Sequence, residues 1–215
     1  MITIVDYGLG NLASIANMLK KAGVKASITS NRDEIASAAR LILPGVGAFE
    51  AGMKNLAERE LVAPLNHAVL ERGIPVLGLC LGLQLMTRRS EEGTLEGLGW
   101  FDADTVRFRL PKESALKIPH MGWNTVRPVR ESPLFAGADD WRFYFVHSYH
   151  VVCANPSDAV GIASHGYDFP AVLGRGNIHG VQFHPEKSHR FGLRLLGNFA
   201  SHVPSEVEMK AVAAE

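Results

Sequence analysis

The chain has 215 residues, of which 47% are hydrophobic and 20% charged. This size and composition are typical of a globular protein with one large domain or two small ones, and they exclude extensive disorder. The 22 Lys and Arg residues balance the 22 Asp and Glu residues, so the chain has no excess positive charge with which to bind nucleic acid.

The first half of the chain alternates short apolar runs with helical patterns. This order is typical of βαβ units and predicts a parallel sheet. The runs at residues 40–45 and 74–79 are continuously apolar, which indicates central strands covered by helices on both faces. We predict strands over residues 2–7, 25–29, 40–45 and 74–79, and helices over 12–23, 32–39 and a long region that ends at residue 72.

After Gly97 the sequence changes to β-type segments separated by turn signals such as residues 174–177. These segments predict antiparallel hairpins added to the parallel sheet. A last helix is predicted from an N-cap at Ser188 to about His202. The fold class is therefore α/β, as a single domain over residues 1–203 with a central, mostly parallel sheet flanked by helices, followed by a frayed tail over residues 204–215. The β-type segments lie around residues 105–106, 143–146, 149–152, 171–173 and 178–183.

Residues 74–84 contain the strongest local signal for chemistry. A buried strand ends at Leu79, Cys80 occupies the turn, and a helix begins at once. Gly78 and Gly82 remove side chains that would collide in so sharp a turn, as in the nucleophile elbow of hydrolases. The positive end of the helix favours a thiolate, which is the nucleophilic form of cysteine. A small buried structural cysteine is the alternative, and the flanking glycines favour the nucleophile.

A thiolate nucleophile needs a base, and His184 has the most suitable neighbour among the nine histidines. Glu186 follows two residues later, and in an extended segment both side chains point to one face, about 6.5 Å apart along the chain. The carboxylate can then hold the imidazole in one tautomer while the other ring nitrogen faces the sulfur. Solvated polar residues at a strand end are the alternative interpretation.

Acyl chemistry also needs N–H donors for a developing oxyanion. The backbone N–H of Leu81, directly after the cysteine, is one source. The glycine-rich turn at residues 44–47 is a second, because it follows a strand whose carboxyl end lies at the same sheet edge as Cys80. Taken alone, these glycines indicate an ordinary turn.

Other possible signals are weak. Residues 8–13 fit the dinucleotide-binding pattern GxGxxA, but the second strand lacks the acidic residue that would bind a ribose. His147 and His150 lack metal-ligand spacing, so we expect no cofactor and no metal. Cys153 lies in an apolar run and is expected in the core, and two cysteines in all provide no disulfide framework.

No segment has the pattern of a membrane span or a signal peptide. The longest apolar stretch, residues 74–86, is interrupted by proline and glycine and is shorter than the ~18 residues expected of a span. The chain begins with MITIVDYG, which contains an acid and no basic residue. We therefore expect a cytoplasmic protein that does not bind a membrane.

With these residues in place, the sequence resembles the class I, triad-type glutamine amidotransferases, in which an elbow cysteine and a His-x-Glu pair occur in this chain order. The resemblance covers nearly the whole chain. The motifs that carry it are IVDYGLGNL at 4–12, PGVGAF at 44–49, GLCLGLQLM at 78–86, PHMGWN at 119–124, YFVHSYH at 144–150 and FHPEKS at 183–188.

The resemblance implies a mechanism in which Cys80 attacks the side-chain amide of glutamine, His184 relays the proton and Glu186 orients His184. It further implies an oxyanion hole formed at Val46 and Leu81. The glutamine site would be lined by Gly47, Gln84, Ser148 and Tyr149.

The details of these motifs are similar to one branch of the family, in which the glutaminase subunit forms a heterodimer with a (β/α)8-barrel cyclase that consumes the ammonia. Neutral ammonia is lost to water as ammonium, so an enclosed route between the subunits is needed. His150 and His189 receive no role. The interface candidates implied by the matching motifs are Asn11, Trp123, Tyr144 and Lys187.

Other functions remain open. A stand-alone Cys-His hydrolase, such as a peptidase of similar fold, would cleave peptides rather than glutamine. A non-catalytic regulatory or scaffold member would have lost a triad residue, and all three are present. The glutaminase subunit of another synthase is an alternative within the family.

Overall fold

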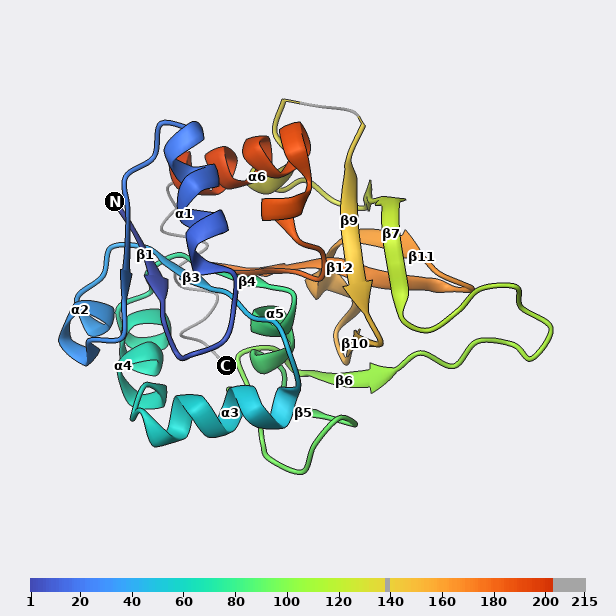
Figure 1. Cartoon of the computed structure of the whole chain (residues 1–215), viewed down its shortest axis with the longest axis horizontal. Coiled ribbons are helices and arrows are strands. Elements are labelled where there is room, and N and C mark those ends of the chain that lie inside the picture. The colour runs from blue at the N-terminus through green and yellow to red at the C-terminus, as the bar shows by residue number, and fades with distance from the viewer. Residues whose placement is uncertain (138–139, 203–215) are drawn as a thin grey trace.

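The computed structural model describes residues 1–137 and 140–202, so the predicted frayed tail lies outside the described residues. An eight-stranded sheet with the strand order β2-β1-β3-β4-β13-β12-β11-β8 forms its centre (Figure 1). Helices cover both faces of this sheet, which confirms the predicted α/β architecture. Among the helices of these residues, none is long and apolar enough to cross a membrane.

Five parallel strands form the half of the sheet on which the site is built. Every residue of β1, β3, β4 and β13 is buried. This continuous burial confirms that the two continuously apolar runs, now β3 and β4, are central and adjacent strands. The bounds are Ile2–Val5 for β1, Ala26–Thr29 for β2, Leu41–Leu43 for β3, Val76–Leu79 for β4 and Ile178–Val181 for β13.

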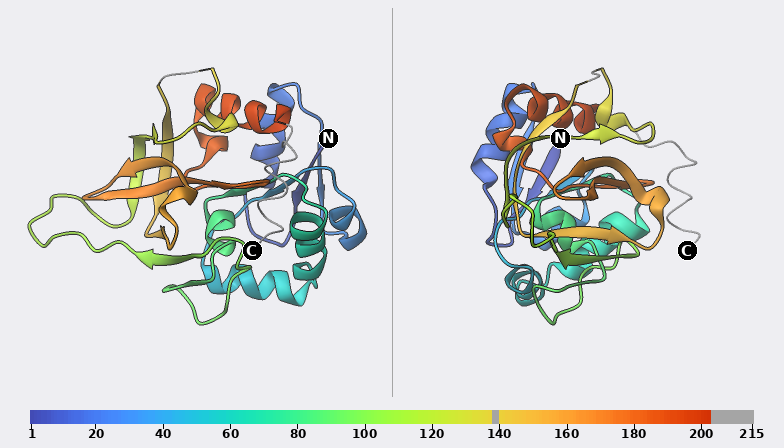
Figure 2. Two further views of the ribbon diagram at one scale, coloured as in Figure 1. Left: turned by 180° about the vertical axis from the view of Figure 1, so that it is seen from behind. Right: turned by 90° about the vertical axis from the view of Figure 1, so that its right-hand side faces the viewer.

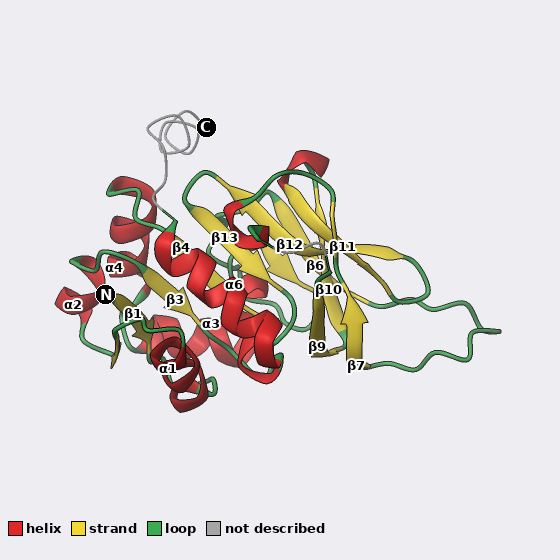
Figure 3. Ribbon diagram, turned by 90° about the horizontal axis from the view of Figure 1, so that it is seen from above, coloured by secondary structure: helices red, strands yellow, loops and turns green. Residues whose placement is uncertain are grey.

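Helices α1 and α6 cover one face of the sheet, and α2 to α5 cover the other (Figures 1 and 3). The side chains of β3 alternate accordingly, because Leu41 and Leu43 join the core on the α3 side whereas Ile42 joins the core on the α1 side. The long predicted helical region is interrupted at Glu60, whose left-handed φ of 56° separates two helices. The bounds are Leu12–Lys21 (α1), Arg32–Ala36 (α2), Phe49–Glu58 (α3), Val62–Asn66 (α4), a π-helical turn at His67–Glu71, Leu81–Leu85 (α5) and His189–Ser201 (α6).

The second half adds antiparallel strands, but only some of them join the main sheet. Strand β12 (Asp168–Arg175) pairs with β13 in a hairpin, and β11 (Ala159–Ser164) and β8 (Arg127–Pro128) extend that edge. Strand β13 also pairs in parallel with β4, a long-range pairing that its local pattern does not encode. Strand β11 lies at the end of the molecule away from α2 and the N-terminus, whereas β13 lies beside β4 (Figure 2).

The prediction that the segments around 105–106, 143–146 and 149–152 are added to the parallel sheet is wrong. Strand β9 (Arg142–His147) pairs with β7 (His120–Thr125), which was not predicted, and the two form a sheet of their own. Strand β10 (Tyr149–Cys153) pairs with β6 (Ala103–Arg107), and β6 pairs with β5 (Arg89–Ser90). Partner choice among strands is decided by tertiary packing, which a local β pattern does not contain. Short 3₁₀ turns occupy Pro133–Phe135, Pro156–Asp158 and Pro185–Lys187.

The turn between β4 and α5 packs against β3 with almost no free space. A Cβ at Gly82 would lie 1.8 Å from the carbonyl oxygen of Leu43, and a Cβ at Gly78 would lie 2.8 Å from the backbone of Gly82 and Leu83. Gly78 therefore allows the elbow to fold back on itself, as predicted. Gly82 has a different role, because it allows α5 to touch the neighbouring strand β3.

We expect Gly82→Ala to lower the free energy of unfolding by about 1–3 kcal/mol or more, because the backbone of α5 or β3 must move. Gly197→Ala is the matched control, since Gly197 lies inside α6 and a Cβ there meets no atom within 4 Å. The control should raise the free energy of unfolding by roughly 0.5–1 kcal/mol. Chemical denaturation measures both, and equal effects at the two glycines would contradict the close contact of α5 with β3.

Candidate active site

Cys80 stands in the turn between β4 and α5, at the carboxyl end of the parallel strands. Its backbone has φ 52° and ψ −107°, a left-handed conformation that is strained for a residue with a side chain. The strain is held in place by a hydrogen bond of 2.8 Å from the Cys80 N–H to the carbonyl of Val181, at the end of β13. The elbow predicted from the glycines thus has the expected sharp geometry.

His184 and Glu186 form a buried pair whose side chains are each 3% exposed. The Nδ1 atom of His184 lies 2.9 Å from Oε1 of Glu186. The predicted contact is present, but the predicted extended segment is wrong, because Glu186 lies in the 3₁₀ turn Pro185–Lys187. Pro185 has a φ fixed near −65°, which suits the first position of such a turn and brings the carboxylate back to the imidazole.

The hydroxyl of Ser188 anchors this segment. It donates to the carbonyl of His184 at 2.6 Å and accepts a hydrogen bond of 3.0 Å from the N–H of Tyr144 in β9. The His184 N–H in turn donates to the carbonyl of Tyr144 at 2.9 Å. Ser188 occupies the predicted N-cap position of α6, but its side chain caps no helix N–H and instead fixes the histidine.

The surroundings of His184 favour its protonated form. Burial by itself lowers the pKa of this imidazole, because the imidazolium loses water. Hydrogen bonds to Cys80 and to Glu186, together with the attraction of both groups, outweigh the loss and raise the pKa to about 10. His184 therefore carries a proton at neutral pH, paired with the sulfur on one side and the carboxylate on the other.

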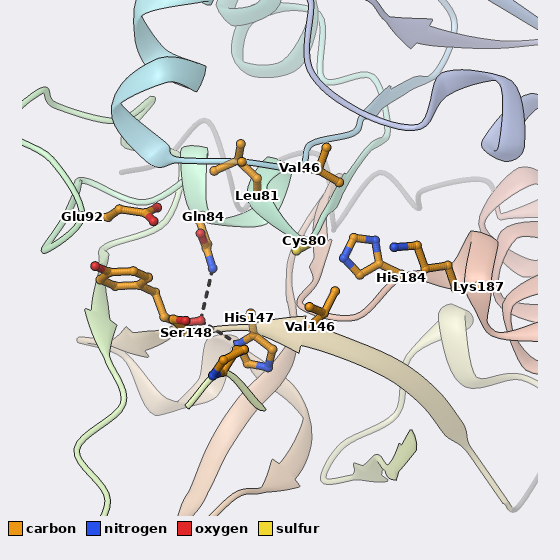
Figure 4. A pocket seen from close by; sticks show the side chains of 13 residues that line it. Val46, Cys80, Leu81, Gln84, Glu92, Val146, His147, Ser148, His184 and Lys187 are labelled. Atoms are coloured by element: carbon orange, nitrogen blue, oxygen red, sulfur yellow. Dashed lines mark hydrogen bonds between the residues drawn. The ribbon is translucent and has the colours of Figure 1, made fainter. Parts of the chain in front are cut away.

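A pocket of about 390 Å³ opens in front of Cys80 (Figure 4). A volume near the lower end of the range for small-molecule sites suits a ligand of amino-acid size. Glu186 lies behind His184 and does not line the pocket. The predicted residues that do line it are Val46, Gly47, Cys80, Leu81, Gln84, Ser148, Tyr149, His184 and Lys187.

The two predicted oxyanion donors lie on the same side of Cys80 in Figure 4. Leu81 is the first residue of α5, where a backbone N–H has no partner within its helix. Val46 lies between two glycines that are required for different reasons. Gly47 has a left-handed φ of 110°, whereas Gly45 leaves no room for a side chain, because a Cβ there would lie 2.5 Å from the hydroxyl of Tyr7. That hydroxyl donates to the carbonyl of Pro44 at 2.6 Å and so holds the start of the turn.

The opposite wall of the pocket is built around the carbonyl of Tyr149. Gln84 Nε2 donates to it at 3.2 Å, and His147 Nδ1 approaches it to 2.7 Å. Burial lowers the pKa of His147 to about 3, so its ring is neutral and the Nδ1–H is the donor. Ser148 lies between these residues and faces the pocket (Figure 4).

Three residues of the site were not predicted from the sequence. Glu92 places a carboxylate in the pocket, and its Oε2 accepts a hydrogen bond of 2.9 Å from the N–H of Phe49. Gln182 Nε2 lies 3.8 Å from the Cys80 sulfur. Tyr7 lies under the turn at 44–47. Tyr7 lies in a motif quoted for the resemblance and Gln182 directly precedes another, whereas Glu92 lies in none of them. No local spacing connects any of the three with Cys80.

Three of the four interface candidates contact one another beside the pocket. Lys187 Nζ lies 5.9 Å from the centre of the Tyr144 ring, and Tyr144 meets Trp123 edge-on at 6.4 Å. Trp123 also stacks on His189, to which no role was assigned, with ring centres 5.6 Å apart. Asn11 is exposed at the N-cap of α1.

The remaining signals stay outside the site. Residues 1–137 and 140–202 contain no group of three or more His, Cys, Asp or Glu side chains that could hold a metal ion. Cys153 is half-buried against the core on the α3 side, and burial, with a smaller effect of Asp158, raises the pKa of its thiol to about 12. His150 is buried, with Nε2 3.0 Å from the Tyr167 hydroxyl.

The sequence is similar to those of known proteins. The chain is 49% identical over 204 residues to imidazole glycerol phosphate synthase subunit HisH 2 of Pseudomonas aeruginosa, which covers 94% of this chain and 100% of that protein. It is 48% identical over 200 residues to the protein of the same name from Methanococcus maripaludis, which covers 93% and 98%.

Solved structures show the same fold at low sequence identity. The structure of PurLQS from Thermotoga maritima superposes with a TM-score of 0.69 and 19% identity, and covers 92% of this chain and 96% of that chain. A crystal structure of a glutamine amidotransferase gives a TM-score of 0.65 at 18% identity, covering 92% and 100%. Residues 3–203 match the family described as glutamine amidotransferase class-I, and the chain belongs to that family.

Proposed function

We propose that this chain hydrolyses glutamine to glutamate and ammonia, as the glutaminase subunit of imidazole glycerol phosphate synthase in histidine biosynthesis. One observation carries the proposal: the strained Cys80 and the His184–Glu186 pair meet at a pocket of amino-acid size. The family supports glutaminase activity, and the names of the Pseudomonas and Methanococcus relatives support the choice of synthase.

The proposed reaction begins when the thiolate of Cys80 forms a bond to the amide carbon of glutamine. The carbonyl oxygen becomes an oxyanion, for which the N–H groups of Val46 and Leu81 are the donors. The imidazolium of His184 then gives its proton to the amide nitrogen, the C–N bond breaks, and ammonia leaves. Glu186 keeps the imidazole oriented throughout, because it binds the nitrogen that does not face the sulfur.

A glutamyl thioester remains on Cys80 after ammonia has left. Neutral His184 accepts a proton from water, whose oxygen bonds to the thioester carbon. The C–S bond breaks, the sulfur leaves as a thiolate, and glutamate is released. The site returns to the imidazolium and thiolate with which it started.

The lining of the pocket suits the charged α-amino-acid end of glutamine as well as its neutral amide. The carboxylate of Glu92 is placed to bind an α-ammonium group. Gly47, Ser148 and Tyr149 supply backbone and hydroxyl groups on the other walls. The pocket has the size of a single amino acid, which favours free glutamine over a peptide and so argues against a stand-alone peptidase.

The surface cluster formed by Lys187, Tyr144 and Trp123 is the proposed docking site of a (β/α)8-barrel cyclase. The cyclase would perform the lyase step. Lys187 lines the pocket and is itself exposed, so a partner placed here would cover the exit of the ammonia. Trp123 is 44% exposed and Met121, two residues earlier on the same strand, is 61% exposed, so this strand offers two large apolar side chains that a partner would cover. The proposed assembly is therefore a heterodimer with an enclosed ammonia channel, formed in the cytoplasm.

Glutamate release tests the proposal directly. The purified chain is mixed with a cyclase subunit and its phosphorylated aminoimidazole-carboxamide ribonucleotide precursor, and glutamate is measured with and without each component. Glutamine should be hydrolysed and glutaminyl peptides should stay intact. Cleavage of peptides instead of glutamine would favour a stand-alone hydrolase, and activation by a different acceptor subunit would favour another synthase.

Cys80→Ala should abolish synthesis from glutamine while synthesis from added ammonium salt continues, because the thiolate is needed only to free ammonia. The matched control is Cys153→Ala, which removes the other cysteine of the chain and does not touch the pocket. Product formation by the complex from each nitrogen source measures the effect. Glutamine use by Cys80→Ala above a trace rate would exclude Cys80 as the nucleophile.

Glu186→Gln should retain more glutaminase activity than His184→Ala. The imidazole transfers the proton, which is typically worth ~10²–10⁴-fold in rate, whereas the carboxylate only orients the imidazole. Steady-state glutaminase assays of both variants in the complex provide the comparison. Equal losses, or a larger loss in Glu186→Gln, would contradict this division of roles.

We expect the isolated chain to be a poor glutaminase that is activated when the cyclase binds its nucleotide. Gly45 has no side chain, so the peptide unit between Gly45 and Val46 can turn at little steric cost, and the Val46 N–H can face the oxyanion or face away. Val46→Pro deletes this donor and should remove the activation, lowering turnover by ~10²–10³-fold with glutamine binding retained. Val46→Ala keeps the N–H and is the control. Normal activation of Val46→Pro, or full activity of the isolated chain, would refute the switch and leave the triad unaffected.

A further inference from the structure

The side chain of Gln182 touches the sulfur of Cys80 and has no part in the mechanism above. Gln182 follows β13 directly, two residues before His184, and is fully buried with 0% exposure. Its Nε2 lies 3.8 Å from Cys80 Sγ, and its Oε1 accepts a hydrogen bond of 3.2 Å from Gln84 Nε2. The backbone reinforces this placement, because the preceding residue, Val181, binds the Cys80 N–H.

The neighbouring groups determine which end of the Gln182 amide faces the sulfur. The Tyr149 carbonyl can only accept hydrogen bonds, so Gln84 must turn its NH₂ group towards it. The second hydrogen of the same NH₂ group points to Gln182, which must therefore present its oxygen to Gln84 and its own NH₂ group to Cys80. Exchanging nitrogen and oxygen in either amide would place two donors or two acceptors face to face.

We propose that Gln182 is a catalytic residue that donates an N–H to the Cys80 sulfur and stabilises its thiolate. A thiolate accepts hydrogen bonds better than a thiol does, so a fixed donor favours the ionised form. The donor acts again when the thioester is hydrolysed and the sulfur leaves with the electron pair of the C–S bond. Because an amide keeps its protons at these pH values, Gln182 stays a hydrogen-bond donor to the sulfur whether His184 is protonated or neutral.

Gln84 is then a positioning residue as well as part of the pocket wall. It transmits the orientation of the Tyr149 carbonyl to the Gln182 amide through two hydrogen bonds of 3.2 Å from one nitrogen. The inference rests on the proposed function in one respect, namely that Cys80 is the nucleophile. Its tests use the chemistry of the sulfur and need no glutamine, so a failure here is distinct from a failure of the glutaminase proposal.

The contact can be observed by NMR, because the chain contains only two glutamines, Gln84 and Gln182. Protein labelled with ¹⁵N in its glutamine side chains gives two pairs of NH₂ signals, and the pair that is absent from Gln182→Glu identifies Gln182. Alkylation of Cys80 with iodoacetamide replaces the thiolate by a neutral thioether, a poor acceptor. One of the two Gln182 protons should move upfield. If neither Gln182 proton moves on alkylation, the proposal is wrong.

Two variants test the effect on reactivity, through the rate of iodoacetamide alkylation as a function of pH in a Cys153→Ala background. Gln182→Met removes the donor at similar size, and we expect alkylation below the midpoint of the pH profile to slow about tenfold. Gln182→Glu keeps the shape and the oxygen that faces Gln84 but turns a carboxylate oxygen towards the sulfur. It should slow alkylation further. If Gln182 had only a structural role, the nearly isosteric Gln182→Glu would slow alkylation less than Gln182→Met does. That result would overturn the proposal.

Asn177 provides a matched control at the other end of β13. It is also fully buried, and its Nδ2 donates to the carbonyls of Val69 and Ile74 at 2.9 and 2.8 Å, away from the pocket. Asn177→Leu should lower the midpoint of thermal unfolding and leave the pH profile of alkylation unchanged. If Asn177→Leu shifts the profile as much as Gln182→Met does, general loosening of β13 explains the effect and the specific donor role is excluded.

Discussion

Contact between the backbones of α5 and β3 decides where Cys80, the proposed nucleophile, stands. Because position 82 has no side chain, α5 lies against the carbonyl of Leu43, and the turn that precedes it has to be tight enough to force Cys80 to a φ of 52°. Such a conformation costs on the order of 1–3 kcal/mol and persists only where the surroundings determine it. Here the neighbouring strands on both sides of β4 do so, and the sulfur is held at the sheet edge where the pocket opens.

Local patterns were sufficient for those parts of the site that one segment contains. The elbow at 78–82 could be predicted because glycine spacing, the apolar strand and the following helix all lie within a few residues. The His184–Glu186 contact could also be predicted, but its backbone could not, because the choice between an extended segment and a 3₁₀ turn depends on Pro185 and on the Ser188 anchor.

Glu92 and Gln182 could not be found, since each reaches the site through long-range packing, and Gln182 lies 102 residues from Cys80 in sequence. Strand β7 was not predicted for a similar reason, because it pairs with β9, to which it is not joined by a short hairpin turn.

Cys80 and His184, the proposed nucleophile and base, are attached to different parts of the fold. Cys80 is tied to β4 and, through Val181, to β13, whereas His184 is tied by its N–H and by the Ser188 hydroxyl to the backbone of Tyr144 in β9. Strand β9 belongs to a separate two-stranded sheet and carries the same Tyr144 whose ring contacts Trp123 on the surface. Substitutions in this small sheet are therefore expected to disturb mainly the position of His184. Substitutions in the parallel sheet are expected to disturb mainly the position of the Cys80 sulfur.

The position of β13 between β4 and β12 also determines when the central sheet can be completed during synthesis of the chain. Ribosomes release the chain from its N-terminus, so β4 and the elbow are made before β13. At about 5–20 residues per second, synthesis of the roughly one hundred residues between them takes on the order of 5–20 s. During that interval one edge of β4 has no strand beside it, and its unpaired N–H and C=O groups are open to other nascent chains. The unfinished polypeptide likewise holds Cys80 without His184, and under the proposed mechanism it cannot consume glutamine until His184 has been made.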